Sequence, residues 1–373
     1  MVQRVHLHIG LPKTATTYLQ AGLWRHRDAL AERGVLLPGR NHRRHLLASL
    51  EFRDDPKLAT RPGDVGQPWR DLVEEVGRWR GESAVISHEF FGPANVEQVR
   101  RGVDQLAPAE VHVIVTARPM TELAPSRWQE WVKNGGRRPI DRFPRRRDYD
   151  PHDAWGWGSF DLADVLSRWS QVVPPERIHV LPTGDPGAGP EEIWERFLDV
   201  LEVPGEPLPA PERPVNVRLG LVQVEALRRV NRQLEGFGDA YDRGRWIRGY
   251  LASGAVMPEG NEPFRPSAET WDDWVARADR ALEMLREGGF DVRGELERLA
   301  PQRELPAWRH PSEVSNAELL RVANQMVAAM LTDVRAHNRE RHRLEGAIRE
   351  AATPPPPGPV RRLVRRLRRL LPG

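Results

Sequence analysis

The sequence contains no cysteine. Disulfides, thiolate metal sites and cysteine nucleophiles are therefore excluded, and this composition suits a reducing compartment. No segment approaches the roughly 18 consecutive apolar residues of a membrane-spanning helix. The first residues also lack the pattern of a signal peptide. These absences predict a soluble cytoplasmic protein.

Lysine is almost as rare as cysteine. The chain has 56 Lys and Arg residues, but only Lys13, Lys57 and Lys133 are lysines. The net charge of +3 is small, and 39% of the 373 residues are hydrophobic, which is typical of a large globular domain with appendages. Because nearly all of the positively charged residues are arginines, the lysine at position 13 is unusual. Its compact ammonium group therefore indicates a specific role.

Short apolar, β-branched segments alternate with segments of helical periodicity over the N-terminal half. The segments with strand character are 4–9, 34–38, 83–92, 110–118 and 177–182. The helical segments are 15–33, 68–80, 95–106, 120–134, 160–173 and 190–201, and from about residue 216 only helices are expected, at 216–235, 271–287 and 312–350. This order predicts an α/β fold, a three-layer sandwich with a central parallel sheet and an all-helical C-terminal extension.

The composition divides the chain into four predicted regions. They are an α/β domain over 1–300 with its motifs within 1–235, a helical extension over 301–352, a proline linker over 353–359 and a basic amphipathic tail over 360–373. Apolar residues of the tail recur at helical spacing and arginines fill the other face, a pattern typical of contact with an anionic membrane surface or an acidic partner. A frayed or packed terminal helix explains the pattern equally well. Peripheral contact with the inner membrane surface through 360–371 is therefore a hypothesis.

The stretch VHLHIGLPKTATTYLQ, residues 5–20, begins as a buried strand and ends as a helix. The small-residue turn between them presents backbone N–H groups at a helix N-terminus, where the helix dipole favours an anion. Lys13 adds a point charge, and threonines follow it at three of the next four positions. The pattern is a P-loop-like anion site. It is not the nucleoside triphosphate loop, because Gly10 precedes the lysine by three residues and no glycine stands directly before it.

The segment PKTATTYLQ, residues 12–20, resembles the 5′-phosphosulfate loop of sulfotransferases that use 3′-phosphoadenosine 5′-phosphosulfate (PAPS), and HIGLP before it resembles bacterial and carbohydrate sulfotransferases. The family pattern P-K-[ST]-G-T-T has glycine where this chain has Ala15, which fits if its φ is negative. The resemblance implies donor binding by Pro12, Lys13, Thr14, Ala15, Thr16, Thr17 and Tyr18. Tyr18 would stack on adenine or, alternatively, pack in the core.

A second motif lies at the end of a later strand. The family binds the 3′-phosphate of PAPS with an arginine at a strand end and a serine eight residues on. In VIVTARPMTELAPSRW, Arg118 and Ser126 have this spacing. An arginine can grip a phosphate bidentately, which a lysine cannot.

The strand in VISHEFF ends at His88 and Glu89. In the family this strand end supplies the general base, a histidine in cytosolic enzymes and a glutamate in several carbohydrate enzymes. The resemblance therefore implies Lys13 and one of Glu89 or His88 as catalytic residues, with Glu89 slightly favoured. The close pairs His6/His8 and His42/His45 have no carboxylate cluster beside them and are interpreted as structural, so no metal is expected.

The resemblance covers about residues 1–235 and implies transfer of a sulfuryl group from PAPS to a hydroxyl or amine of a carbohydrate or natural product, with 3′-phosphoadenosine 5′-phosphate (PAP) as product. The acceptor itself is not specified. The arginine- and tryptophan-rich connection 135–160 is either part of its binding site or a solvated insertion. Two alternatives stay open: a P-loop-type kinase, and a non-catalytic binding protein that associates through its basic tail. No nucleic-acid partner is expected, and the oligomeric state is not predicted.

Overall fold

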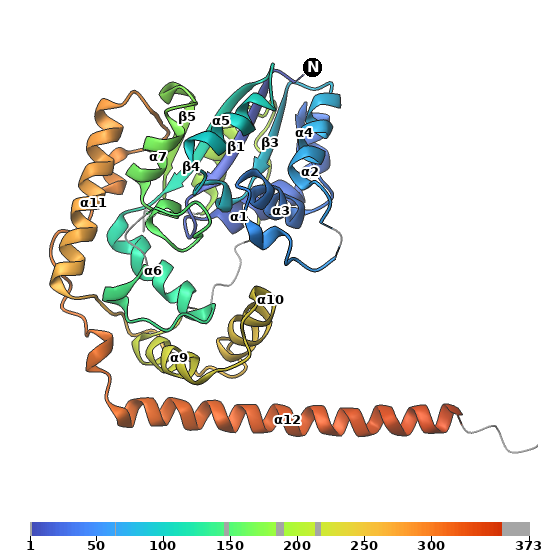
Figure 1. The fold of residues 1–373 in the computed structure, drawn as a ribbon, viewed down its shortest axis with the longest axis vertical. Coiled ribbons are helices and arrows are strands. Elements are labelled where there is room, and N and C mark those ends of the chain that lie inside the picture. Colours follow the sequence, from blue (N-terminus) through green and yellow to red (C-terminus); the bar gives the residue numbers. More distant parts are fainter. Residues whose placement is uncertain (1, 64, 145–148, 184–189, 213–217, 353–373) are drawn as a thin grey trace, which may run out of the picture.

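The computed structural model describes residues 2–63, 65–144, 149–183, 190–212 and 218–352. The predicted linker 353–359 and tail 360–373 lie outside the described residues, as do residues 145–148 of the arginine-rich connection. The described chain is an α/β fold with a six-stranded central sheet (Figure 1).

The sheet is entirely parallel, with strand order β2-β3-β1-β4-β5-β6. Its strands are β1 (Arg4–Gly10), β2 (Val35–Leu36), β3 (Ser83–Ser87), β4 (Glu110–Ala117), β5 (Ile178–Pro182) and β6 (Asp291–Val292). The first strand, β1, lies between β3 and β4, so the chain reverses its direction of growth across the sheet there. In open parallel sheets such a switch point is where ligands bind, at the carboxyl ends of the strands.

Helices cover both faces of the sheet, which confirms the predicted three-layer arrangement. Val5, Leu7 and Ile9 belong to the larger apolar cluster, together with buried residues of the helices α3, α5, α6, α7, α9 and α11. Residues of the other face, such as Val85 and Ile114, pack with helices α1 and α8. Alternate side chains of each strand thus point to opposite faces of the sheet and pack into two separate cores.

The helices largely follow the predicted periodicity. Their bounds are α1 (Thr16–Arg25), α2 (Arg27–Glu32), α3 (His42–Phe52), α4 (Pro68–Arg78), α5 (Val96–Asp104), α6 (Met120–Lys133), α7 (Leu162–Trp169), α8 (Pro190–Val200), α9 (Leu221–Gln233), α10 (Ala240–Asp242), α11 (Ala268–Glu287) and α12 (Asn316–Ala352), with a π-helix at Arg243–Leu251 after α10.

Three expectations about the elements are wrong. The segment 15–33 is two helices because the chain turns at His26, whose backbone leaves the helical region. The region after residue 216 is not only helical, since β6 adds two residues to the sheet edge beside β5. The helix α3 has no counterpart in the prediction, although Asn41 caps it by accepting a hydrogen bond from the Arg44 N–H at 3.3 Å.

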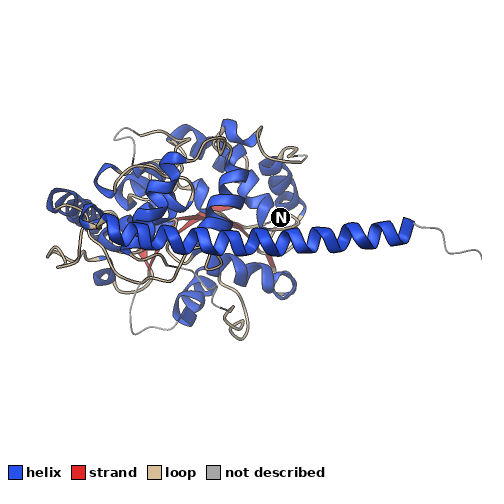
Figure 2. Cartoon of the chain, turned by 90° about the horizontal axis from the view of Figure 1, so that it is seen from below, coloured by secondary structure: helices blue, strands red, loops and turns tan. Residues whose placement is uncertain are grey.

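The last helix, α12, runs beneath α9 and α10 and then projects well beyond the body of the molecule (Figures 1 and 2). Val322 and Met326 are buried on its first turns, whereas Val334 and Ile348 are exposed. None of the described helices is long and apolar enough to cross a bilayer.

Candidate functional site

The candidate site lies at the carboxyl ends of β3, β1 and β4. The turn after β1 is bonded directly to β4: the Leu11 N–H donates to the Thr116 carbonyl at 2.7 Å. The Thr116 hydroxyl donates to the Gly10 carbonyl at 2.9 Å and lies 2.7 Å from the Thr14 hydroxyl. These contacts fix the loop over the edge of the sheet, beside the strand that carries Arg118.

The loop has an unusual backbone. Lys13 and Ala15 have φ of 70° and 67°, in the left-handed region. The condition of negative φ expected for Ala15 is therefore wrong, and the family glycine would be the less strained residue here. Ala15 is also the N-cap of α1, and as an alanine it offers no side-chain acceptor to the N–H groups of the first turn.

The loop side chains divide into buried and accessible groups. Thr14 is 2% exposed, and its hydroxyl is engaged by Thr116 and the Leu11 carbonyl, so it acts inside the loop. Thr16 and Tyr18 are also buried, and Tyr18 packs in the cluster beneath α1. Thr17 is exposed. Of the loop hydroxyls, Thr17 is the one presented outward.

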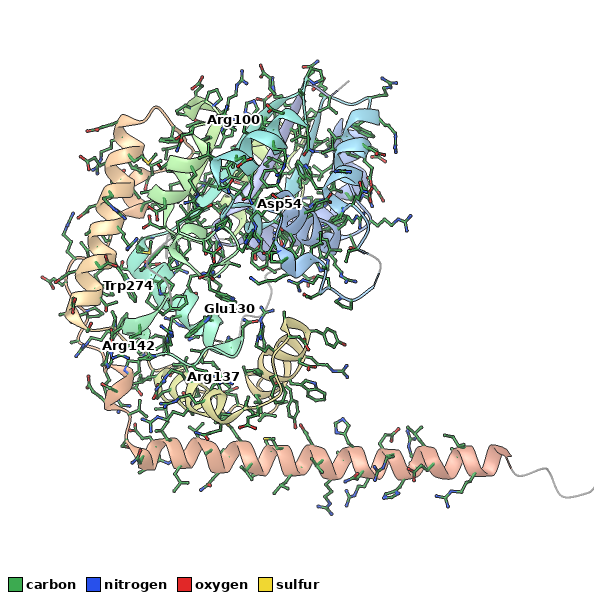
Figure 3. All side chains as sticks on the ribbon, viewed as in Figure 1. Asp54, Arg100, Glu130, Arg137, Arg142 and Trp274 are labelled. Carbon is green, nitrogen blue, oxygen red and sulfur yellow. The ribbon has the colours of Figure 1, made fainter. Side chains whose placement is uncertain are left out.

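Lys13 contacts a carboxylate that sequence reasoning missed. Its Nζ lies 3.2 Å from Oε2 of Glu130, near the end of α6. The other oxygen, Oε1, lies 2.7 Å from Nε of Arg248 in the π-helix. Glu130 lies on the side of α6 that faces the helical segment after α10 (Figure 3). Its position was detectable, because it follows Ser126 by four residues and so shares a helix face with it.

Arg118 and Ser126 are aligned with this carboxylate along α6. Arg118 immediately follows β4, and its Nη2 donates to Glu122 at 2.7 Å. The Nε of Arg118 is buried without a hydrogen-bond partner among the described residues. Glu122, Ser126 and Glu130 are spaced by four residues, so one face of α6 leads from Arg118 to the contact with Lys13.

His88 and Glu89 follow β3. The His88 N–H donates to the His8 carbonyl at 3.0 Å, and His88 Nδ1 accepts the Phe90 N–H at 3.1 Å. Burial lowers the pKa of His88, so the ring is neutral and its Nδ1 lone pair is already used. Glu89, whose Oε2 lies 4.0 Å from Nδ1 of His88, opposes this lowering.

Glu89 is a partly exposed carboxylate beside α1. Gln20 donates to its Oε2 at 3.3 Å. Burial would raise the pKa of Glu89, but His88, a backbone N–H and Gln20 outweigh it and hold the pKa below its ordinary value. Glu89 is therefore ionised at neutral pH and able to accept a hydrogen bond from a hydroxyl.

Arg127 is a second site residue that the sequence did not single out. It is 3% exposed, and its Nη2 donates to the Ala154 carbonyl at 2.6 Å. Burial lowers its pKa to about 10, while Glu89 and Glu130 oppose that shift. The guanidinium thus lies in the field of both carboxylates.

The described part of the connection 135–160 is packed rather than solvated. Three arginines stack on its rings: Arg127 on Trp155 at 4.6 Å, Arg168 on Tyr149 at 4.5 Å and Arg277 on Trp157 at 3.8 Å. These contacts fix residues 149–160 against α6, α7 and α11. The alternative of a solvated insertion is wrong for these residues.

The histidine pairs 6/8 and 42/45 do not form a ligand set. Among the described residues, no group of three or more His, Cys, Asp or Glu side chains is placed to hold a metal ion. His6 and His8 lie on one face of β1, and His45 donates to the Pro38 carbonyl from Nε2 at 2.8 Å while Nδ1 accepts the Ser87 N–H.

Comparison with known proteins gives two distant structural similarities. No family model and no curated protein matches the sequence. A solved sulfotransferase from Alicyclobacillus acidocaldarius is 15% identical with a TM-score of 0.39, over 62% of this chain and 93% of that one. The sulfotransferase domain from the curacin biosynthetic pathway is 13% identical with a TM-score of 0.34, over 74% of this chain and 97% of that one. At this distance, neither similarity assigns a role to a residue of this chain.

Proposed function

We propose that the protein is a PAPS-dependent sulfotransferase that acts on a hydroxyl or amine of a carbohydrate or natural product. One observation carries the proposal. The loop of Lys13, the strand end of Arg118 and the strand end of Glu89 converge at the carboxyl edge of three adjacent parallel strands. This convergence supports the proposed roles of anion site, second phosphate-binding cation and carboxylate base, because open α/β sheets bind ligands at this edge.

The residues present suit a nucleotide with two separate anionic groups. The uncapped first turn of α1 and Lys13 would hold the 5′-phosphosulfate, with Thr17 presented outward beside them. The buried Nε of Arg118 has no hydrogen-bond partner in the part of the chain that the structure describes, so it is available to donate to a 3′-phosphate. Tyr18, buried beneath the loop, is assigned to the core rather than to the adenine.

The proposed chemistry is an in-line transfer. PAPS supplies the sulfuryl group: the acceptor oxygen bonds to sulfur while the bond between sulfur and the 5′-phosphate oxygen breaks, and PAP leaves. Lys13 stabilises the charge that develops on that phosphate oxygen. Glu89 takes the acceptor proton, because its carboxylate is ionised and accessible, whereas Nδ1 of His88 is occupied by a backbone N–H.

Titration with PAP in EDTA tests the donor site. We expect binding of about micromolar affinity for the wild type, weakened at least about tenfold by Arg118→Ala because a desolvated phosphate contact is lost. Arg78→Ala is the matched control, since Arg78 forms the same kind of i,i+4 ion pair with Glu74 on the surface of α4. Absence of binding to the wild type would overturn the proposal, and a preference for ATP with magnesium would favour the kinase alternative.

The base is tested separately by PAP release in a screen of acceptors with PAPS. We expect Glu89→Gln to abolish transfer while it retains PAP binding, because only the proton acceptor is removed. His88→Asn can still accept the Phe90 N–H through its side chain and should retain transfer. The opposite pattern would assign the base to His88.

A further inference from the structure

Glu130 is shared between two parts of the molecule that are far apart in the sequence. Its Oε2 contacts the Lys13 ammonium at 3.2 Å, and its Oε1 contacts the Arg248 guanidinium at 2.7 Å. Asn134 also donates to Oε1, at 3.4 Å. The side chain of Glu130 is only 12% exposed, whereas those of Lys13 and Arg248 are 30% and 59% exposed, so water screens the Arg248 contact more than the Lys13 contact.

Positive charge exceeds negative charge at this point. Burial would raise the pKa of Glu130, but Lys13, Arg248 and Lys133 overcome it and hold the pKa below its ordinary value. The ionised Glu130 carboxylate therefore lies in the field of several cations. An anion placed beside Lys13 would compete with Glu130 for the ammonium, and Arg248 would still hold the carboxylate afterwards.

Arg248 belongs to a backbone element of an uncommon type. It lies in the π-helix Arg243–Leu251, and such elements are frequently found at functional sites. Ile247 and Leu251 of this π-helix are buried, whereas Trp246 is 45% exposed. The element thus has an inner side anchored in the protein and an outer side that a ligand can reach.

We propose that Glu130 is a positioning residue that couples the Lys13 loop to the π-helix Arg243–Leu251. Without an anion, Glu130 holds Lys13; when the donor binds, Lys13 moves to it and Arg248 retains Glu130. Movement of Arg248 changes how strongly the Glu130 carboxylate attracts the Lys13 ammonium. It therefore changes the affinity of the protein for the donor. This inference rests on the proposed function, because it takes the anion at Lys13 to be the nucleotide.

A double-mutant cycle on PAP affinity tests the coupling in the full chain. Glu130→Gln should tighten PAP binding about fivefold, because Lys13 no longer has a competing carboxylate. Arg248→Gln should weaken PAP binding about threefold, because Glu130 loses the Arg248 guanidinium and then attracts the Lys13 ammonium more strongly. In the double variant, Arg248→Gln should have no further effect. Glu74→Gln, which removes a carboxylate from a surface pair on α4, should bind PAP as the wild type does.

The cycle separates coupling from a simple change of net charge. If Arg248 acted only as one more distant cation, its effect would persist unchanged in the Glu130→Gln background and the inference would be overturned. Weaker PAP binding by Glu130→Gln would overturn it as well. Both of these tests require that the protein binds PAP. A second measurement that does not depend on PAP is therefore needed.

Because the chain has only three lysines, the acylation of each one can be followed separately. The rate at which an amine-reactive reagent acylates Lys13, read by mass spectrometry, reports its release from Glu130, with Lys57 as internal reference. We expect faster acylation of Lys13 in Glu130→Gln and slower acylation in Arg248→Gln. If the wild type does not bind PAP but these rates change as expected, the proposed function fails and the coupling stands. Unchanged rates overturn the coupling whatever the nucleotide result.

Discussion

The two faces of the central sheet carry different chemistry. On one face, β1 contributes Val5, Leu7 and Ile9 to a fully apolar cluster. On the other face, the same strand contributes His6 and His8, both almost completely buried. A strand with alternating apolar and polar residues normally places the polar set in water, but here both sets are inside.

The polar face is organised into hydrogen-bonded groups at its two ends. Toward the amino end of the strands, Nδ1 of His112 lies 2.9 Å from Nε2 of His179, and Nδ1 of His179 lies 2.5 Å from Asp291. Toward the carboxyl end, Nδ1 of His8 lies 2.8 Å from the Ser87 hydroxyl, next to the candidate site. Val85 and Ile114 pack on the histidine face as well, so the comparison teaches that stability on the first face depends on volume, and on the second face on volume together with protonation and hydrogen bonding.

The largest expected effect is acid unfolding caused by the polar face. Burial, with neighbouring histidines in the case of His6 and His112, lowers the pKa of His6 to about 3 and of His8 and His112 to about 4, from 6.5. The unfolded chain therefore binds more protons below about pH 6.5, so stability is complete above that pH and falls towards about pH 4.

The loss should approach about 1 kcal/mol per histidine per pH unit. Urea unfolding across that pH interval measures it. The variant His6→Leu should have a shallower dependence on pH, because one titrating group is gone. An unfolding free energy that does not change between neutral pH and about pH 5 would contradict the assignment.

The second effect belongs to the apolar face. Leu7 is completely buried, so Leu7→Ala should cost about 2–5 kcal/mol of unfolding free energy through lost contacts and a cavity. The same urea series checks it. The cost should be the same at neutral and acid pH, because no titratable group is involved. A cost that grows on acidification would show that the two faces are not independent.

The third effect tests the polar face next to the site. Thr116→Val keeps the volume but removes the hydroxyl that joins the Gly10 carbonyl to Thr14, leaving buried polar groups unpaired at a cost of about 1–3 kcal/mol. We expect PAP affinity to fall as well, because the loop loses its anchor. Val113→Thr, the reverse exchange on the apolar face of the same strand, should lower stability without a change in PAP affinity. Equal PAP affinities in the two variants would contradict the role of Thr116.

These differences explain what the sequence could and could not predict. The strands and the parallel order were predictable, because β-branched runs between helical segments allow few other folds. Strand β6 was not predictable, because its two residues, Asp291 and Val292, are too few to show a periodicity. They form a strand only because they pair with β5. The break at His26 depends on how α1 and α2 pack, which local pattern does not encode.

The same distinction between local pattern and long-range contact applies to the candidate site. Lys13, Arg118 and Glu89 stood out because a local motif requires each of them, and the fold brings their elements to one edge. Glu130 and Arg248 carry no local motif; their importance arises from a contact between segments that are distant in the chain. Arg127 was hidden in the same way, because one more arginine is unremarkable in this composition.

The smallest expected effect concerns Ala15, which lies between β1 and α1 and packs, partly buried, against the cluster that contains Val85 and Ile114. Its φ of 67° strains any residue with a Cβ, so Ala15→Gly should raise the unfolding free energy by up to about 1 kcal/mol, less the greater backbone freedom of glycine when unfolded. Urea unfolding at neutral pH measures the change. Ala48→Gly, within α3, is the matched control and should lower stability by about 1 kcal/mol, because there the helical φ suits alanine. If both variants lost stability equally, the left-handed conformation of the loop would be wrong, and alanine would fit this turn in the way first expected from the sequence.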